Sequence, residues 1–407
     1  MTEPLGRRFW AVWLSSSSSF LAEGLLLGAV PLLAATLTLD ARLISITDAV
    51  QQAGWLLLGL TSGIAADRLP RLRIMWLANA ARAVIAFTFA MVVMIGHASL
   101  PTLYLLGLLL GLAAPFFDNA SSAVLPELVQ PHQFQWANSL TQMALALAAT
   151  LIGPLIGSAA FVLWPAAPFW FAAAAFAVGA LVSAIASRVA GAAPASKDTA
   201  DHRELLMQGL TYLWRHRELR SLAIAVGVVN FVMTGVIAVL VLYVLQILHL
   251  PQSAYGVVVA MFAVGGLAGA LLTSRITALI GERTSVLVAL GFFGASMIAL
   301  GVFPMVGVAF PAIAVAGFFS MVWNVTVNSY RQRVVPLDLL GRVTSVFRML
   351  AFLAMPVGAL AAGMLSHSLG LPVTYLLGGV LLLISGSWTA TQIGGMPNHP
   401  EREAHIG

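Results

Sequence analysis

The sequence predicts an all-α integral membrane protein with about twelve transmembrane helices. Of its 407 residues, 60% are hydrophobic and only 9% are charged, whereas soluble domains have about 25% charged residues. Apolar runs of about twenty residues recur along the chain, and each is long enough to cross a hydrocarbon core of roughly 30 Å as a helix. A transmembrane β-barrel would instead need strands of about ten residues with alternating polarity, and the apolar runs do not alternate.

The apolar runs predict one helix for each membrane span. The expected ranges are 9–35, 43–65, 74–95, 101–122, 137–162, 166–188, 221–248, 253–275, 284–303, 308–329, 343–366 and 372–393. Arginines gather in alternate connecting segments, and basic residues favour the cytoplasmic side of a membrane. We therefore expect both termini to be cytoplasmic.

A polar segment, residues 191–220, divides the chain into an N-terminal half (1–190) and a C-terminal half with a short tail (221–407), each with six predicted helices. Within this segment, one helical face is formed by Leu206, Leu210, Leu213 and Trp214. This spacing predicts an amphipathic helix that lies on the inner membrane surface.

Several classes of function are disfavoured by the composition. Cysteine is absent and Lys197 is the single lysine, so thiolate metal sites and a Lys-containing nucleotide-binding loop are excluded. The histidines have no metal-ligand spacing, and no nucleophile and base lie together in the helices, so we expect no cofactor, no metal and no enzymatic activity. The arginines are dispersed among short loops, which does not favour nucleic-acid binding.

The most specific motif is GIAADRLPRLR, residues 63–73, between the second and third predicted helices. It resembles the signature that the major facilitator superfamily has at this place. FFDNASSAVLPELV followed by WANSL, QGLTYLWRHRELR, and NSYRQRVVPLDLLGRVTSVFRMLAFLAMPVGAL resemble its drug:proton antiporter group, which includes macrolide efflux proteins and the enterobactin exporter.

This resemblance implies the major facilitator fold, in the inner membrane of a bacterium. It also implies export of a small amphipathic compound, such as a drug, an antibiotic or a siderophore, in exchange for protons, by a protein that we expect to be monomeric. A metabolite importer or uniporter of the same fold, or a non-transporting sensor or scaffold, is the alternative.

The resemblance further implies an inner gate. Asp67 would pair with arginines and with the start of the eleventh helix. The implied gating residues are Gly63, Asp67, Arg68, Arg71, Arg73, Gly341 and Arg342. An ordinary basic loop is the alternative interpretation.

The segment Gly153-Pro154-Leu155-Ile156-Gly157 resembles the Gly-Pro signature associated with antiport, and it is echoed in the second half by Pro356-Val357-Gly358. Proline removes a backbone donor and glycine removes bulk, so Gly153, Pro154, Gly157, Pro356 and Gly358 are expected to let these helices bend and pack closely. A static kink is the alternative.

Two carboxylates lie within predicted helices of the first half, Glu23 in the first and Asp118 in the fourth. Ionisable groups in hydrocarbon are costly and usually face a cavity, so both are candidates for proton coupling; hydrogen bonding between helices is the alternative. Arg82, in the third helix, is expected either to pair with Asp118 or to extend toward the membrane surface.

Polar residues spaced four apart mark the seventh and tenth helices. In the resembled fold the first, fourth, seventh and tenth helices line the central cavity. The residues expected to contact substrate are Ser19, Phe117, Asn230, Thr234, Asn324 and Asn328. Interhelical hydrogen bonding or packing is the alternative.

Overall fold

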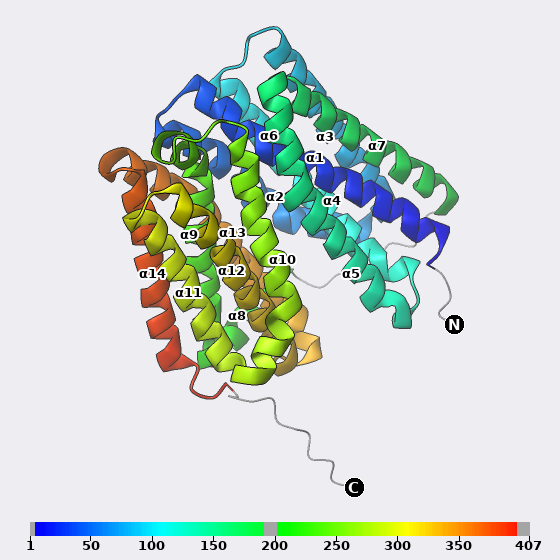
Figure 1. Ribbon diagram of the computed structural model, residues 1–407. Helices are drawn as coiled ribbons and strands as arrows, with labels where there is room; N and C mark the ends of the chain where they lie inside the picture. Colours follow the sequence, from blue (N-terminus) through cyan, green and yellow to red (C-terminus); the bar gives the residue numbers. More distant parts are fainter. Residues whose placement is uncertain (1–4, 191–201, 397–407) are drawn as a thin grey trace. The chain divides into compact units, whose positions relative to one another are not determined.

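The computed structural model describes residues 5–190 and 202–396, and every regular element in these ranges is a helix (Figure 1). Eleven helices in this part of the chain are long and apolar enough to span a membrane. The twelfth candidate is α2 (Ala41–Arg68), which is bent by 49° between Gly59 and Thr61. The predicted fold class is therefore confirmed. Lys197 and the side chain of Leu206 lie outside the described residues.

The first compact unit comprises α1 to α7 together with residues 250–260. Within it, α2 packs on α4, and α7 packs on both α1 and α3. Besides α2, its helices are α1 (Arg7–Leu37), α3 (Arg71–Met94), α4 (Leu100–Leu128), α5 (Phe134–Leu145), α6 (Gly153–Leu163) and α7 (Ala167–Ala190).

The second unit comprises residues 202–249 and 261–396 of the described chain. Within it, α9 packs on α13, and α11 packs on α12 and α14. Its helices are α8 (His202–Arg215), α9 (Arg217–Leu242), α10 (Ala254–Ile280, from residue 261 onward), α11 (Glu282–Val302), α12 (Val306–Val334), α13 (Leu337–Leu369) and α14 (Leu371–Gln392). Each predicted range overlaps an observed helix. Several helices continue beyond their apolar run, because a helix does not end where the hydrocarbon ends.

The fifth predicted span, in which Gly153, Pro154 and Gly157 were expected to allow a bend, is irregular in the structure. It consists of a 3₁₀ turn (Pro131–Gln133), α5, a π-helical segment (Ala146–Ile152) and α6. Pro154 has no backbone N–H, and the Gly153 N–H donates to the carbonyl of Ala148, five residues back. Such π-helical insertions are rare and are frequent at functional sites.

Glycines allow a close backbone approach in each unit. A Cβ added at Gly157 of α6 would lie 2.2 Å from the carbonyl oxygen of Leu25 in α1. In the second unit, a Cβ at Gly358 of α13 would lie 2.1 Å from the carbonyl oxygen of Phe231 in α9. Pro356 lies inside α13 without ending it. In this segment, Gly358 allows the close approach of α13 to α9, whereas Pro356 does not break the helix.

We expect Gly157→Ala to lower the thermal stability of the purified protein. The added methyl group meets backbone atoms, which cannot rotate away as a side chain can, and overpacking typically costs about 1–3 kcal/mol. Gly291→Ala is the matched control, since a Cβ there meets nothing within 4 Å. Equal unfolding temperatures for the two variants in the same detergent would contradict the close contact.

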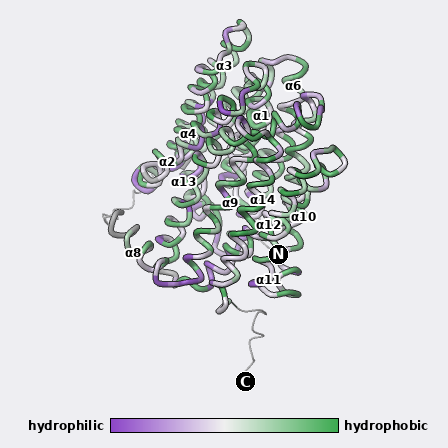
Figure 2. Tube along the Cα trace, turned by 90° about the vertical axis from the view of Figure 1, so that its left-hand side faces the viewer, coloured by the Kyte–Doolittle hydropathy of each residue, from purple (hydrophilic) through white to green (hydrophobic). Residues whose placement is uncertain are grey.

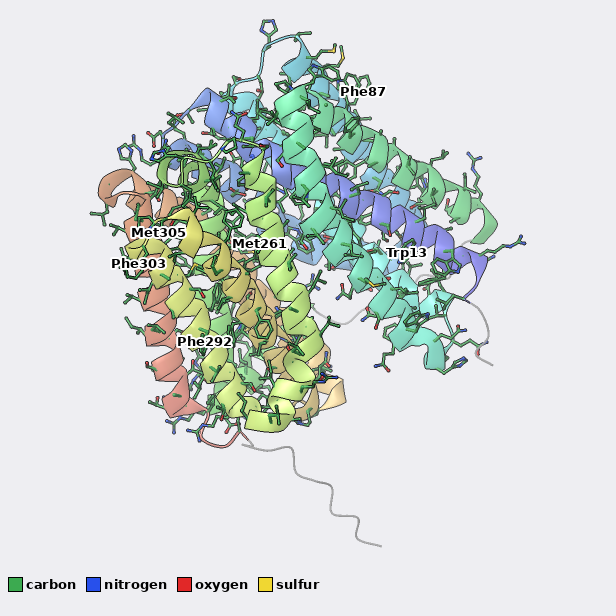
Figure 3. The ribbon with its side chains drawn as sticks, viewed as in Figure 1. Trp13, Phe87, Met261, Phe292, Phe303 and Met305 are labelled. Carbon is green, nitrogen blue, oxygen red and sulfur yellow. The ribbon has the colours of Figure 1, made fainter. Side chains whose placement is uncertain are left out.

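Large apolar side chains remain exposed on the helices of both units. Phe87 of α3 is 51% exposed, Phe292 of α11 is 52% exposed and Leu271 of α10 is 78% exposed. Figure 2 shows hydrophobic residues along most of the helical trace, and Figure 3 shows the side chains of Phe87 and Phe292 on the ribbon. Soluble proteins rarely expose so much apolar surface, so these side chains are suited to contact with lipid.

The amphipathic helix expected in the linker is α8, and it packs on the start of α13. A Cβ added at Gly209 would lie 2.6 Å from the carbonyl oxygen of Arg342, and the Arg342 guanidinium donates to the side chain of Gln208. Leu213 is fully buried, whereas Trp214 is 53% exposed. Part of the predicted apolar face therefore contacts the second unit itself.

Candidate functional site

An ion pair joins the middle of α1 to the middle of α3. Nη2 of Arg82 donates to Oε1 of Glu23 at 2.5 Å. The Arg82 side chain is 3% exposed, whereas that of Glu23 is 31% exposed. The expectation that Arg82 would pair with Asp118 or extend to the membrane surface is therefore wrong, because its side chain points toward α1 and is held there by Glu23.

The guanidinium of Arg82 lies among aromatic rings. Its central carbon is 4.4 Å from the ring centroid of Phe176 in α7 and 5.9 Å from that of Phe117 in α4. Its Nε and Nη1 are buried without a hydrogen-bond partner among the described residues. Arginine stays protonated in proteins, so Glu23 is the group that balances this charge within the described part of the first unit.

Buried polar contacts lie one to two helical turns from the ion pair. Oγ of Ser19 donates to Oδ1 of Asn79 at 3.0 Å, which links α1 to α3. Oγ of Ser15 lies 2.6 Å from Oγ of Ser183, which links α1 to α7. A Cβ added at Gly179 of α7 would lie 2.7 Å from Nδ2 of Asn79. These contacts fix the spacing of α1, α3 and α7 around Glu23 and Arg82.

Two residues expected to contact substrate are instead part of this packing. Ser19 and Phe117 are fully buried. Ser19 is engaged with Asn79, and Phe117 belongs to an apolar cluster with Met75 and Val124. Asp118 is half-buried on α4. The sequence showed Asn79 and Arg82 three residues apart on one helix, but not that this face meets Glu23.

In the motif between α2 and α3, Arg71 forms an ion pair with Glu127 of α4. Nη1 of Arg71 lies 2.5 Å from Oε1 of Glu127 and donates to the Ala123 carbonyl at 2.7 Å, which joins α3 to α4. Asp67, Arg68 and Arg73 are exposed. A Cβ at either Gly63 or Gly341 would meet nothing within 4 Å, so neither glycine is needed for close packing here. The pairing of Asp67 with Gly341 and Arg342 stays a prediction.

A chain of hydrogen bonds runs along α12 in the second unit. Nη2 of Arg331 donates to Oδ1 of Asn328 at 2.7 Å, and Nδ2 of Asn328 donates to Oδ1 of Asn324 at 2.7 Å. Asn324 is exposed and Asn328 is half-buried. The predicted stripe therefore continues to Arg331, which lies just beyond the predicted span 308–329.

The polar side chains predicted on α9, Asn230 and Thr234, are less available for hydrogen bonds to a ligand than those of Asn324 and Asn328. Nδ2 of Asn230 donates to the carbonyl of Val226 in its own helix at 2.8 Å. Thr234 is only 8% exposed. Of the two stripes, the one on α12 is thus the better candidate for contact with substrate.

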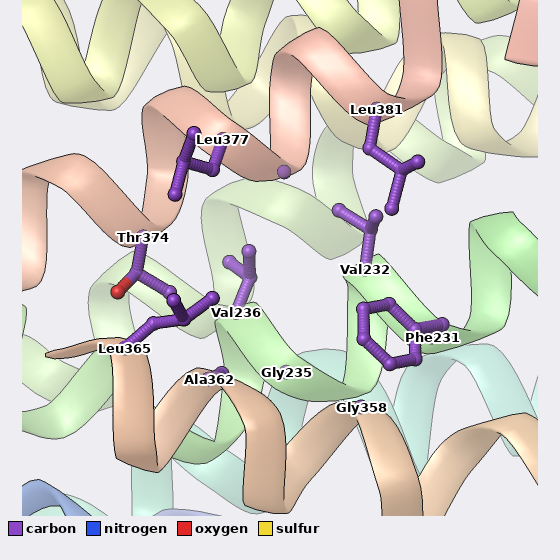
Figure 4. A pocket seen from close by; sticks show the side chains of 11 residues that line it. Phe231, Val232, Gly235, Val236, Gly358, Ala362, Leu365, Thr374, Leu377 and Leu381 are labelled. Atoms are coloured by element: carbon purple, nitrogen blue, oxygen red, sulfur yellow. The ribbon is translucent and has the colours of Figure 1, made fainter. Parts of the chain in front are cut away.

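An apolar pocket of about 80 Å³ lies between α9, α13 and α14 (Figure 4). Its one polar side chain is that of Thr374, whose hydroxyl lies 2.8 Å from that of Ser366. Drug-sized ligands occupy pockets of roughly 300–1,000 Å³. This pocket is too small and too uniformly apolar for such a ligand.

Up to twelve helices of the described chain are long and apolar enough to span a membrane, which defines the class as a polytopic membrane protein. The chain belongs to the Major Facilitator Superfamily, whose family model matches residues 12–359. This finding confirms the family that the sequence motifs predicted, and a transporter of this family handles a small-molecule substrate.

One relative is the multidrug efflux pump Tap of Mycolicibacterium fortuitum, which is 28% identical over 344 residues, or 80% of this chain and 81% of Tap. Among solved structures, a bacterial homologue of the iron transporter ferroportin in an inward-facing state matches with a TM-score of 0.75 at 16% identity, covering 96% of this chain and 100% of that one. The nucleoside transporter NupG matches with a TM-score of 0.74 at 12% identity, covering 96% of this chain and 100% of its own. At these identities the structural matches show the fold alone.

Proposed function

We propose that this transporter exports a small amphipathic compound, such as a drug, an antibiotic or a siderophore, in exchange for protons. The observation that supports coupling is the Glu23–Arg82 ion pair, which lies midway along α1 and α3. The similarity to Tap, a multidrug efflux pump, favours export of such compounds. The protein would act in the inner membrane of a bacterium, with both termini cytoplasmic.

The unequal burial of the two partners suggests how a proton acts. Glu23 is 31% exposed and exchanges a proton when this surface faces water, while Arg82 is 3% exposed and arginine stays charged in proteins. When Glu23 is protonated, the attraction between the two groups falls and a buried guanidinium loses its counter-charge. An uncompensated buried charge is strongly unfavourable. Protonation therefore favours an arrangement of α1 and α3 in which Arg82 reaches water or another anion.

The driving force is sufficient for uphill export. One proton supplies about 1.4 kcal/mol per pH unit and roughly 2.3 kcal/mol per 100 mV of membrane potential. In alternating access the two halves expose one site to each side of the membrane in turn. Glu23 would take up a proton on the outer side as the cargo leaves, and it would release this proton on the inner side as the next cargo binds.

Asn324→Leu is expected to weaken cargo binding more than it lowers folded yield. Asn324 is exposed, and among the described residues its side chain accepts one hydrogen bond, from Asn328, so its loss disturbs little packing. Asn230→Leu serves as the control, because the Asn230 amide bonds to its own helix. The check is the apparent affinity for transported compounds in proteoliposomes. Equal affinities in the wild type and Asn324→Leu would assign this stripe to packing.

Transport by everted membrane vesicles tests the proposed direction and coupling. In this geometry an exporter moves compounds into the vesicle lumen when respiration acidifies it. We expect amphipathic dyes and antibiotics to accumulate, and a protonophore to release them. Accumulation of metabolites in right-side-out vesicles instead would identify an importer, and the absence of any flux would favour a sensor or scaffold.

A further inference from the structure

Arg331 places a charge in the second unit that no acidic side chain of the described unit balances. It is 9% exposed, and its Nε is buried without a hydrogen-bond partner among the described residues. Its guanidinium lies 4.8 Å from the ring centroid of Phe347 in α13. Among the described side chains, the oxygen to which it donates is the neutral amide oxygen of Asn328.

A purely structural role does not account well for this arrangement. Cations near the end of a helix interact favourably with its dipole, and α12 ends at Val334. Arg331 and Arg333 both lie in the last turn of α12, and Arg333 also forms an ion pair with Glu282 of α11. Arg331 differs because it is buried and, within the described part of the unit, its charge is met by aromatic and amide groups.

The direction of the hydrogen bonds along α12 follows from the chemistry of the side chains. Arginine can only donate, so Asn328 must present its oxygen to Arg331. The amide nitrogen of Asn328 then donates to Asn324, which must accept with its oxygen. The remaining Nδ2 of Asn324 is a donor at the exposed end of the chain. Hydrogen bonds in series polarise one another, so this donor is strengthened by the charge of Arg331.

We propose that the Asn324–Asn328–Arg331 chain binds the anionic group of an amphipathic cargo, such as a carboxylate, a sulfonate or a phosphate. The exposed amide donates to an anionic oxygen, and Arg331 supplies the balancing charge. This inference rests on the proposed function, and it adds amphipathic organic anions to the compounds that the transporter recognises.

Binding of two matched dyes to the purified protein in nanodiscs of zwitterionic lipid tests this inference. Anilinonaphthalene sulfonate is an amphipathic anion, and phenylnaphthylamine has the same ring system without the sulfonate. We expect the wild type to prefer the sulfonate, and Arg331→Gln to weaken sulfonate binding by roughly tenfold or more while binding of the neutral dye is unchanged, because charge-assisted hydrogen bonds are the stronger ones. Arg275→Gln is the control, since it removes an exposed charge from the same unit.

Asn324→Leu is a second variant that tests the inference even if Arg331→Gln does not fold. It should also remove the preference for the sulfonate dye over the neutral dye. Binding of the neutral dye without any preference for the sulfonate, or a preference that survives both substitutions, would overturn the anion site and leave the proposed export intact. If Arg331→Gln weakened the binding of both dyes equally, Arg331 would have a role in packing rather than in anion binding. Binding of neither dye would overturn both the anion site and the proposal of amphipathic cargo.

Discussion

Glu23→Gln is expected to abolish uphill export driven by a pH gradient, while cargo binding and downhill exchange continue. The Gln side chain mimics protonated Glu23, because it can accept a hydrogen bond from Nη2 of Arg82 but supplies no counter-charge. We therefore expect it to favour the arrangement of α1 and α3 that protonation favours. It cannot take up or release a proton, so the arrangement of the two helices no longer responds to pH. The measurement is transport in proteoliposomes at several imposed pH gradients, with binding measured on the same preparation.

Glu127→Gln provides the control for this experiment. Glu127 is a carboxylate of the same unit, paired with Arg71 and 43% exposed, and its loss should leave the pH dependence unchanged. If Glu23→Gln retained uphill export with the wild-type pH dependence, Glu23 would not be the coupling residue. Asp118, which is half-buried on α4, would then be the next carboxylate to test.

Glu23→Leu is expected to destabilise the protein strongly, and adding Arg82→Met should restore much of the loss. Removing Glu23 leaves a guanidinium that is 3% exposed without its counter-charge, and breaking one side of a buried pair typically costs about 3–5 kcal/mol. Arg82→Met alone should cost less, because Glu23 is 31% exposed and can be hydrated or protonated.

The four proteins of this double-mutant cycle are compared by their unfolding free energies in one detergent. A coupling energy larger than about 0.5 kcal/mol shows that the two residues interact. Additive effects would mean that the pair contributes nothing to stability. In that case the asymmetric burial would no longer explain how protonation is linked to helix movement.

The spans could be predicted because bilayer thickness sets their length, so hydropathy alone located each helix. The π-helical segment at residues 146–152 could not be predicted. Hydropathy does not report which carbonyl a backbone N–H selects, and Pro154 was the single local sign of a disturbance. The helical spacing of Asn324 and Asn328 did predict that they share a face, and the structure shows them hydrogen-bonded.

The central contact of the site was beyond the reach of the sequence. Glu23 and Arg82 are 59 residues apart, and both were recognised as charges within helices, but the sequence does not show which helix faces meet. Arg331 was missed for a different reason. Its position beside the inner end of a span satisfies the positive-inside rule, so nothing in the pattern distinguished a buried arginine from an ordinary loop arginine.

Proton movement during downhill cargo flux most directly tests the claim that Glu23 couples export to protons. Proteoliposomes are loaded with a transported compound and a pH-sensitive dye, and they are diluted without a pH gradient while potassium and valinomycin clamp the membrane potential. We predict that the lumen of wild-type vesicles acidifies as the compound leaves, and that Glu23→Gln vesicles release the compound without a pH change. A constant lumenal pH in the wild type, or equal acidification in Glu23→Gln vesicles, would contradict the claim.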